Sequence, residues 1–378
     1  MLFSYRNIEK ELLMESLIVE RKSSGMEFSY PIVWESSFQT LADEIRRIHG
    51  FRAKKICIVS DSNVAPLYAE EARTALAPLG LTVETYVFPA GEEHKCLDTV
   101  TGLYRFLIAH KFQRNDMLAA LGGGVAGDLT GFTAATYLRG IDFIQLPTTL
   151  LAQVDSSVGG KTGVDFEQYK NMVGAFLQPR LVYMNMKTLK TLPEDQFASG
   201  MGEVLQTGAI RDKDLLSWID AHEQKLQERD PDALATVIRA CCKVKAAVVE
   251  EDPKDKGLRA ILNFGHTLGH AIEKCTNFEL LHGQCVGIGS IGASWLSMKR
   301  GMISEDDFRW IHKLHRDFNI PTSVTGLTVD EIVRTSHSDK KMEEGHIHFI
   351  LLDGIGNAVI DSTVTDEELR TAASVLIR

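Results

Sequence analysis

The sequence predicts a two-domain protein, with an α/β domain built around a parallel sheet followed by a mainly α-helical domain. The chain has 378 residues, and single hydrophobic cores stop growing at roughly 250 to 300 residues. Short apolar runs alternate with helical patterns in the first half, whereas long helical patterns dominate from about residue 189 onward. We therefore expect a Rossmann-like α/β domain over residues 1–187 and a helical domain over residues 188–378.

Four short apolar runs predict the strands of the first domain. They cover residues 54–60, 82–88, 116–121 and 142–146, and helical patterns over residues 64–79 and 95–110 separate the first three. Strands that alternate with helices form βαβ units and a parallel sheet. Ligands of such sheets bind beyond the carboxyl ends of the strands. The loops that follow these runs are therefore the expected site of function.

The second domain is expected to consist mainly of long helices. Apolar residues recur at helical spacing over residues 232–251, 258–273 and 286–299. This spacing places apolar side chains on one face of each helix, where they can pack against a shared core.

Composition and charge exclude several classes of protein. The formal net charge is -10, whereas nucleic-acid binders usually carry a basic patch or balance. The six cysteines show no CxxC spacing, which is typical of reduced thiols. Charged residues interrupt every apolar run in residues 1–22, so this segment is neither a signal peptide nor a membrane span. We expect a cytoplasmic protein with no nucleic-acid or membrane partner.

A glycine-rich segment, GGGVAGD, directly follows the third predicted strand at residues 122–128. Glycines let a backbone approach a pyrophosphate closely, and the N–H groups at a helix start can bind it. The spacing differs from the GxGxxG fingerprint of dinucleotide-binding folds. A tight turn that binds no ligand explains these glycines equally well.

The stretch LPTTLLAQVDSSVGGKTGVD, residues 146–165, is predicted to form a polar functional loop after the fourth strand. It combines several hydroxyls with Asp155 and Lys161 and shows no periodicity. Polar, glycine-rich loops placed after a buried strand often carry function. A solvated surface loop is the alternative, but it has no need of the anion-binding groups of Lys161 and the nearby Lys170 and Asn171.

Histidines and a carboxylate indicate a metal site in the second domain. His266 and His270 lie four residues apart and project from one face of a helix. This spacing suits two metal ligands, or one ligand beside an acid-base residue. His282 and Glu203 supply further donors. Two histidines and one carboxylate leave coordination positions open, as catalytic zinc sites do.

Long motifs of this chain closely resemble the 3-dehydroquinate synthase family, from about Asp61 to Gly356. The motifs are GGGVAGDLTGFTAATYLRG, QLPTTLLAQVDSSVGGKTGVD, KNMVGAF, LNFGHTLGHAIE and LHGQCVGIG. The resemblance implies a lyase that requires NAD and one divalent metal, zinc or cobalt. Its substrate would be a small anionic sugar-acid phosphate, 3-deoxy-arabino-heptulosonate 7-phosphate, which it converts to 3-dehydroquinate and phosphate in the shikimate pathway of aromatic amino acid biosynthesis. The implied steps are transient oxidation by NAD, phosphate elimination, re-reduction and intramolecular aldol closure.

The same resemblance implies the roles of individual residues. It implies metal ligands at Glu203, His266 and His282. The implied NAD site consists of Asp61, Asn63, Glu92, Lys95, Gly123, Gly124, Asp128, Thr148, Thr149, Asp155 and Lys170. The residues implied for substrate binding and catalysis are His270, Lys161, Lys245, Arg259, Asn263, Asn171, Arg139, Lys340 and Lys341. Arg139 matches an arginine that reaches into the neighbouring subunit's site in this family, which implies a homodimer.

Two positions depart from the family pattern. Gln206 stands where the family commonly has lysine, and Gln284 stands where glutamate is expected. An amide cannot replace the electrostatic attraction of an ammonium, so the substrate is held differently or a related substrate is used. Position 284 is expected to lie behind the metal ligands, where substitutions are better tolerated.

Three alternative functions remain at this point. One is another sugar-phosphate cyclase, acting on sedoheptulose 7-phosphate, glucose 6-phosphate or an amino analogue. The second is a metal-dependent glycerol or alcohol dehydrogenase, and the third is a non-catalytic binding protein. Residues Lys245, Arg259, Asn263 and His270 match the dehydroquinate pattern and favour the synthase. The intact set of implied metal ligands argues against a non-catalytic protein.

Overall fold

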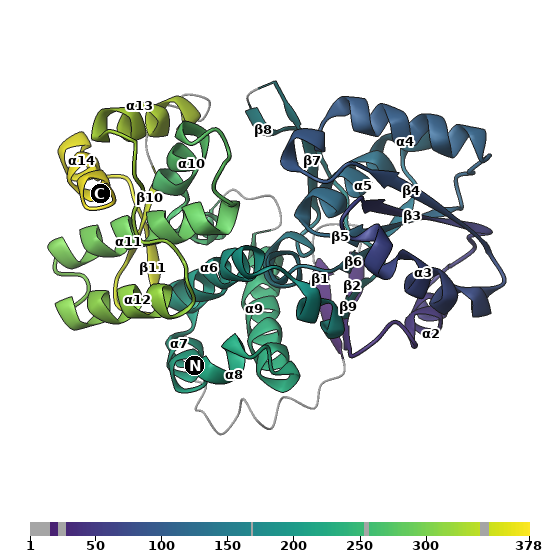
Figure 1. Ribbon diagram of the computed structural model, residues 1–378, viewed down its shortest axis with the longest axis horizontal. Coiled ribbons are helices and arrows are strands. Elements are labelled where there is room, and N and C mark those ends of the chain that lie inside the picture. Colours follow the sequence, from purple (N-terminus) through teal and green to yellow (C-terminus); the bar gives the residue numbers. More distant parts are fainter. Residues whose placement is uncertain (1–15, 22–27, 168, 253–256, 341–347) are drawn as a thin grey trace. The chain divides into compact units, whose positions relative to one another are not determined.

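The computed structural model describes residues 16–21, 28–167, 169–252, 257–340 and 348–378 (Figure 1). The chain forms two compact units, of which one ends at Leu192 and the other begins at Pro193. The first unit is an α/β structure and the second is mainly helical. This confirms the fold class that the sequence predicted.

The first unit contains a seven-stranded sheet in the order β1-β2-β9-β6-β5-β3-β4. Strand β1 is antiparallel to β2, and every other neighbouring pair is parallel. The strands of this sheet are β1 (Ser16–Arg21), β2 (Phe28–Glu35), β3 (Lys55–Asp61), β4 (Thr82–Phe88), β5 (Met117–Gly122), β6 (Asp142–Pro147) and β9 (Val182–Asn185). Strands β3 to β6 correspond to the four predicted apolar runs.

Helices cover both faces of this sheet. They are α2 (Leu41–Arg47), α3 (Ala65–Leu76), α4 (Leu97–Ala109) and α5 (Gly124–Thr136). Successive residues of β3 point to opposite faces, so Ile56 and Ile58 pack with α2 and α3, whereas Cys57 and Val59 pack with α4 and α5. A strand buried on both faces needs a continuous apolar run, and this explains why β3 was visible in the sequence.

Residues 146–165 do not form the single polar loop that we expected. Residues Ala152–Ser156 form a π-helix, and β7 (Lys161–Phe166) pairs with β8 (Tyr169–Phe176) in a separate hairpin. The surface-loop alternative is also wrong, because Val154, Val158 and Val164 are buried. Strand β7 is ordered by its packing against α5. Its six residues include Thr162 and Gly163 and show too little periodicity for a strand to be recognised in the sequence.

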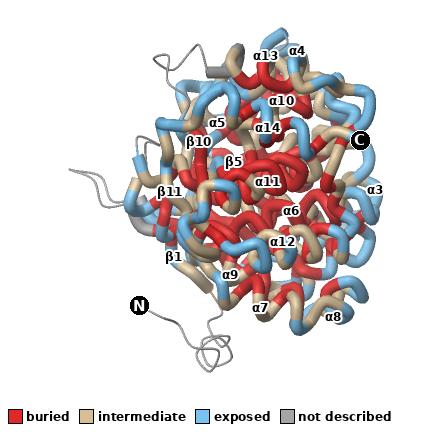
Figure 2. The backbone as a smooth tube through the Cα atoms, turned by 90° about the vertical axis from the view of Figure 1, so that its left-hand side faces the viewer, coloured by how far each residue is buried: buried red, intermediate tan, exposed pale blue. Residues whose placement is uncertain are grey.

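The second unit is a group of helices with one small hairpin. Its elements are α6 (Glu194–Arg211), α7 (Lys213–Ala221), α8 (Glu223–Gln227), α9 (Pro231–Glu251), α10 (His266–Cys275), α11 (His282–Lys299), α12 (Glu305–Asp317), α13 (Val329–Lys340), α14 (Asp366–Ser374), β10 (Phe349–Leu352) and β11 (Ala358–Asp361). Helix α11 contacts α6, α10, α12, α14 and β10, and it is buried along most of its length (Figure 2). Within the described part of the chain, no helix is long and apolar enough to span a membrane.

The helix predicted over residues 258–273 is interrupted. Residues Leu258–Asn263 form a 3-10 helix, and α10 begins only at His266. Gly265 between them has φ +78, and a Cβ there would lie 2.4 Å from Ser290 Oγ of α11. Glycine adopts this left-handed conformation without steric cost. The break therefore serves close packing, which helical periodicity alone does not reveal.

Arg300, directly after α11, connects three elements of the helical unit. Its guanidinium donates to both carboxylate oxygens of Glu368 in α14, each at 2.7 Å, and to Asp361 of β11 at 2.9 Å. Hydrogen bonds from Arg300 are the largest cause that lowers the pKa of Glu368, to about 2. The negative charge of Glu368 is therefore favoured in the folded protein.

We expect Glu368→Gln to lower the free energy of unfolding by about 1 kcal/mol at pH 7, since the pair is partly exposed and bidentate. The folded-state pKa of Glu368 lies below its ordinary 4.5, so its contribution is present above pH 4.5 and is lost as the pH falls towards 2. Urea unfolding at several pH values measures this difference. The exposed neighbour Glu367→Gln is the control, and a pH-independent difference for Glu368→Gln would contradict the assignment.

Candidate functional site

Glycines allow α6, α10 and α11 to approach one another closely. A Cβ on Gly202 of α6 would lie 2.3 Å from the carbonyl oxygen of Gly283, and a Cβ on Gly289 of α11 would lie 2.0 Å from that of Gly265. Any side chain at these positions would push the helices apart, because packed interiors do not absorb such overlaps. The contact between Gly202 and Gly283 brings the neighbouring residues Glu203 and His282 together.

Four side chains with metal-binding atoms meet in this helical unit. His266 and His270 project from α10, His282 is the first residue of α11, and Glu203 comes from α6. The ring centroids of the histidines lie 5.1 to 5.5 Å apart, and one nitrogen of each lies within 4.8 Å of the others. Oε1 of Glu203 lies 3.5 Å from Nε2 of His282 and 3.9 Å from Nε2 of His266.

This donor set fits a divalent metal. Glu203 is only 3% exposed, and its buried Oε1 has no hydrogen-bond partner. A buried carboxylate oxygen without a donor is costly unless a cation compensates it. Imidazole nitrogens with one carboxylate oxygen are ligands that zinc and cobalt accept. The structure thus brings together the three predicted ligands Glu203, His266 and His282, with His270 beside them.

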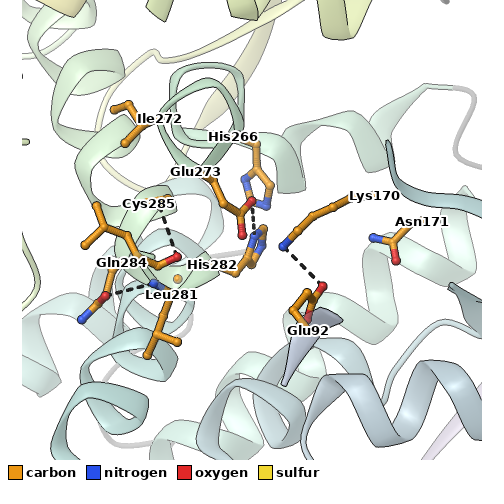
Figure 3. A network of polar contacts seen from close by, with 12 residues as sticks. Glu92, Lys170, Asn171, His266, Ile272, Glu273, Leu281, His282, Gln284 and Cys285 are labelled. Carbon is orange, nitrogen blue, oxygen red and sulfur yellow. Dashed lines mark hydrogen bonds and ion pairs between the residues drawn. The ribbon is translucent and has the colours of Figure 1, made fainter. Parts of the chain in front are cut away.

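A second buried carboxylate stands behind this cluster. Glu273, which is 2% exposed, places Oε2 3.5 Å from Nδ1 of His282 (Figure 3). Burial alone would lower the pKa of His282, but the carboxylates of Glu203 and Glu273 outweigh it and raise this pKa to about 10. The cluster is therefore a strongly cation-attracting environment. Glu273 was not predicted, although it lies three residues after His270 and so on the same side of the helix.

Buried cations of the helical unit supply groups for an anion. Arg259 is 3% exposed, and its Nη1 is buried without a hydrogen-bond partner. Lys245 of α9 is buried as well. An unsatisfied buried guanidinium nitrogen favours an anionic partner, since phosphate and carboxylate match its geometry. Of the other predicted substrate residues, Lys340 is the last residue of α13, and Lys341 lies outside the described residues.

The two glutamines that depart from the family pattern both bind backbone groups. Nε2 of Gln206, a 2% exposed side chain, donates to the carbonyl oxygens of Leu262 and Phe264, the latter at 3.2 Å. These carbonyls flank Asn263, which is itself exposed. Oε1 of Gln284 accepts the N–H of Leu281 at 3.1 Å and so caps the start of α11. Gln206 therefore fixes the backbone on both sides of Asn263.

In the α/β unit, predicted cofactor residues gather at the carboxyl ends of three adjacent strands. Asp61 ends β3 and accepts the N–H groups of Asn63 and Val64 at 2.8 and 3.0 Å. Gly123 and Gly124 follow β5 and start α5, while Thr148 and Thr149 follow β6. Since β6, β5 and β3 are neighbours in the sheet, these residues share one edge. This edge is where a doubly wound sheet binds its ligands.

A charged network lies in the same unit. Lys95, 4% exposed, places Nζ 2.6 Å from Asp128 Oδ2, and Lys170 lies 3.3 Å from Glu92 (Figure 3). Asp155 belongs to the π-helix, and Lys161 starts β7 with an exposed side chain. Burial alone would lower the pKa of Lys95, but Asp128 and Glu92 outweigh it and hold this pKa above its ordinary value. Lys95 therefore carries its charge inside the fold.

Arg139 lies apart from the strand-end residues of its own unit. It follows the carboxyl end of α5, has φ +67 and is exposed. Helix α5 spans 13 residues, which corresponds to roughly 20 Å at 1.5 Å per residue. Gly123 and Gly124 stand at the opposite end of this helix. Arg139 therefore does not reach the cofactor residues of the same subunit that surround the start of α5.

Comparison with known proteins shows which family this chain resembles over most of its length. Residues 85–199 match the family model for the 3-dehydroquinate synthase N-terminal region, and residues 200–342 match that for the C-terminal region. A 3-dehydroquinate synthase of Acetivibrio thermocellus is 45% identical over 343 residues, which cover 90% of this chain and 94% of the relative.

Two solved structures share the whole fold. A 2-epi-5-epi-valiolone synthase of Streptomyces hygroscopicus, with NAD⁺ and Zn²⁺ bound, has a TM-score of 0.86 and 28% identity, covering 94% of this chain and 99% of that one. A 2-deoxy-scyllo-inosose synthase complexed with carbaglucose-6-phosphate, NAD⁺ and Co²⁺ has a TM-score of 0.85 and 26% identity, covering 95% and 99%. Both neighbours hold NAD⁺ and a divalent metal.

We expect His282→Ala to abolish stoichiometric zinc or cobalt binding, because it removes one of the donors that face Glu203. Glu203→Gln should do the same, since an amide is a weaker ligand and carries no charge. Elemental analysis after dialysis against limiting metal measures the occupancy. The exposed histidine variant His348→Ala is the control, and full metal content in His282→Ala would rule out the assigned site.

Proposed function

The chain belongs to the 3-dehydroquinate synthase family, and we propose that it converts 3-deoxy-arabino-heptulosonate 7-phosphate to 3-dehydroquinate and phosphate, using NAD and one divalent metal. The observation that carries this proposal is a buried carboxylate oxygen of Glu203 that accepts no hydrogen bond and faces His266 and His282. In the same helical unit, Arg259 offers a buried guanidinium nitrogen with no partner. A metal-ligand cluster together with anion-binding groups is what a phosphorylated sugar acid requires.

The histidines and carboxylates of the helical unit prepare the hydroxyl chemistry. A divalent metal held by Glu203, His266 and His282 would supply Lewis acidity at a substrate hydroxyl. Glu203 and Glu273 keep the surroundings of His282 negative and favour that cation. In this proposal His270, one helical turn from His266, would accept or return the hydroxyl proton. NAD, when bound, would supply hydride transfer in both directions within one turnover, so we expect no net formation of NADH.

Recognition of the substrate depends on separate cationic groups for its phosphate and its carboxylate. Arg259 and Lys245 supply buried cations in the helical unit, and Lys161 supplies an exposed one in the α/β unit. Charge-assisted hydrogen bonds from such groups are strong and geometrically specific. Asn263 and Asn171 add neutral donors for hydroxyl or phosphate oxygens. The phosphate itself can accept the proton that is lost during its elimination.

The same cationic groups argue against the alternative function, a cyclase that acts on a sugar phosphate without a carboxylate. Sedoheptulose 7-phosphate and glucose 6-phosphate lack a carboxylate, so they would leave one of these cationic groups without an anionic group of the substrate. Gln206 does not alter this count, because its amide nitrogen is used by two backbone carbonyls. A substrate with two anionic groups therefore matches the cations of this chain better than a substrate with one.

With NAD and zinc or cobalt, the enzyme is expected to release phosphate from the heptulosonate at least 100-fold faster than from the two carboxylate-free sugar phosphates, which corresponds to about 2.7 kcal/mol. Phosphate release and formation of the carbocyclic product are measured for each substrate, while absorbance at the NADH band is followed. Turnover of a carboxylate-free sugar alone would establish a different cyclase. Stoichiometric NADH formation would establish a dehydrogenase.

We further propose that the active unit is a homodimer in which Arg139 serves the partner's site. Its exposure and its position at the far end of α5 from Gly124 support this, since the residue cannot act beside the strand-end cluster of its own subunit. An exposed arginine in a left-handed backbone conformation is suited to reach another chain, because its side chain is not engaged in the core.

Mixing two inactive variants tests the role of Arg139. Arg139→Ala and His266→Ala should each lose at least 95% of activity, on the order of 2 kcal/mol or more. In a mixed dimer, one of the two sites contains both an intact Arg139 and an intact His266, so about one quarter of wild-type activity should return after statistical mixing. Absence of recovery in mixed dimers that are verified by differential tagging would remove the proposed role.

A further inference from the structure

The β7–β8 hairpin contains a bulge opposite Asp165. Val164 pairs with Val173 and Phe166 pairs with Tyr169, so the single residue Asp165 faces three residues of β8, at positions 170 to 172. Asn171, in the middle of these three, has φ +52. Bulges of this kind bend a strand and re-aim a side chain, and they are frequent beside active sites. Specific hydrogen bonds are therefore needed to hold Asn171 in its left-handed backbone conformation.

Three hydrogen bonds anchor Asn171 in a closed ring. The backbone N–H of Asn171 donates to Oδ1 of Asp165 at 2.8 Å. The backbone N–H of Asp165 donates to the carbonyl oxygen of Lys95 at 2.8 Å. Nζ of Lys95 then donates to Oδ1 of Asn171 at 2.6 Å. Each of the three residues thus donates to the next and accepts from the third, so removing one group loosens the other two.

This ring of hydrogen bonds also fixes the orientation of the side-chain amide of Asn171. An ammonium group can only donate, so it must meet the amide oxygen and not the amide nitrogen. Lys95 is itself held by Asp128 at 2.6 Å, and its burial prevents water from taking its place. The amide nitrogen of the exposed Asn171 is therefore left to donate outward.

We propose that Asp165 is a positioning residue, which fixes Asn171 so that its amide nitrogen donates to an oxygen of the bound sugar phosphate. This inference rests on the proposed function, because it deepens the role of Asn171 in substrate binding. Asp165 itself does not touch the substrate in this scheme. It acts through the backbone N–H of Asn171, and a loss of its carboxylate releases the bulge and lets the amide turn away from the substrate.

The first test examines the ring of hydrogen bonds by NMR and requires no enzymatic turnover. With asparagine labelled by ¹⁵N, the backbone resonance of Asn171 is assigned by its disappearance in Asn171→Ala. Asp165→Ala should shift this resonance or broaden it, because the N–H loses its acceptor. Glu167→Gln removes an exposed carboxylate from the same hairpin and should leave it unchanged. An unchanged Asn171 resonance in Asp165→Ala would overturn the ring whether or not the proposed reaction occurs.

The functional part is tested by a double-mutant cycle on the heptulosonate. Asp165→Ala should raise KM about tenfold with a smaller change in kcat, and Asp165→Asn should restore most of the loss because its amide oxygen can still accept the N–H. On an Asn171→Ala background, Asp165→Ala should add less than twofold. If Asp165 had a purely structural role, the increases in KM of the two single variants would multiply in the double variant. That result would overturn the inference, and so would a wild-type KM for Asp165→Ala. A wild type that does not release phosphate would count against the proposed function, while the resonance of Asn171 still reports on the ring.

Discussion

The close approach of α6, α10 and α11 is the constraint on which the candidate metal site depends. A Cβ on Gly283 would lie 1.9 Å from the carbonyl oxygen of Ser199, so only glycine permits this contact. Glu203 follows Gly202 and His282 precedes Gly283. The contact between these two glycines therefore brings the two side chains together without a long loop. Because the ligands lie on packed helices, their positions are fixed before a metal binds, and this lowers the cost of ordering them.

Such a site leaves polar groups that the folded chain does not satisfy by itself. Oε1 of Glu203 and Nη1 of Arg259 are buried without hydrogen-bond partners. Their burial lowers the stability of the protein, and hydrophobic packing elsewhere, such as that around α11, must offset this. A cation beside Glu203 and an anion beside Arg259 would remove both costs. Ligand binding should therefore stabilise this fold more than the contact area alone would indicate.

The sequence predicts those parts of the molecule that a local pattern determines. Strands β3, β5 and β6 are recognisable because burial on both faces demands continuous apolar runs, and the edge strand β4 is recognisable from its β-branched and aromatic residues. Strand β2, which lies between β1 and β9, escaped prediction because Pro31 stands within its apolar run, and proline is unusual inside a sheet. The interruption at Gly265 depends on its contact with α11, which lies far away in the sequence. Asp165 and Glu273 escaped prediction for a similar reason, since each acts on a neighbour through geometry that only the folded chain defines.

The two glutamines show how a departure from a family pattern can be local. At position 206, a side chain that reaches the carbonyls of Leu262 and Phe264 needs only hydrogen-bond donors, and an amide provides them without burying a charge. At position 284, the N–H of Leu281 needs one acceptor oxygen, which an amide offers as a carboxylate would. Neither exchange affects Arg259 or Lys245, which we propose for the substrate site. The cations that we propose for recognising a sugar acid are thus retained, and these residues favour the synthase.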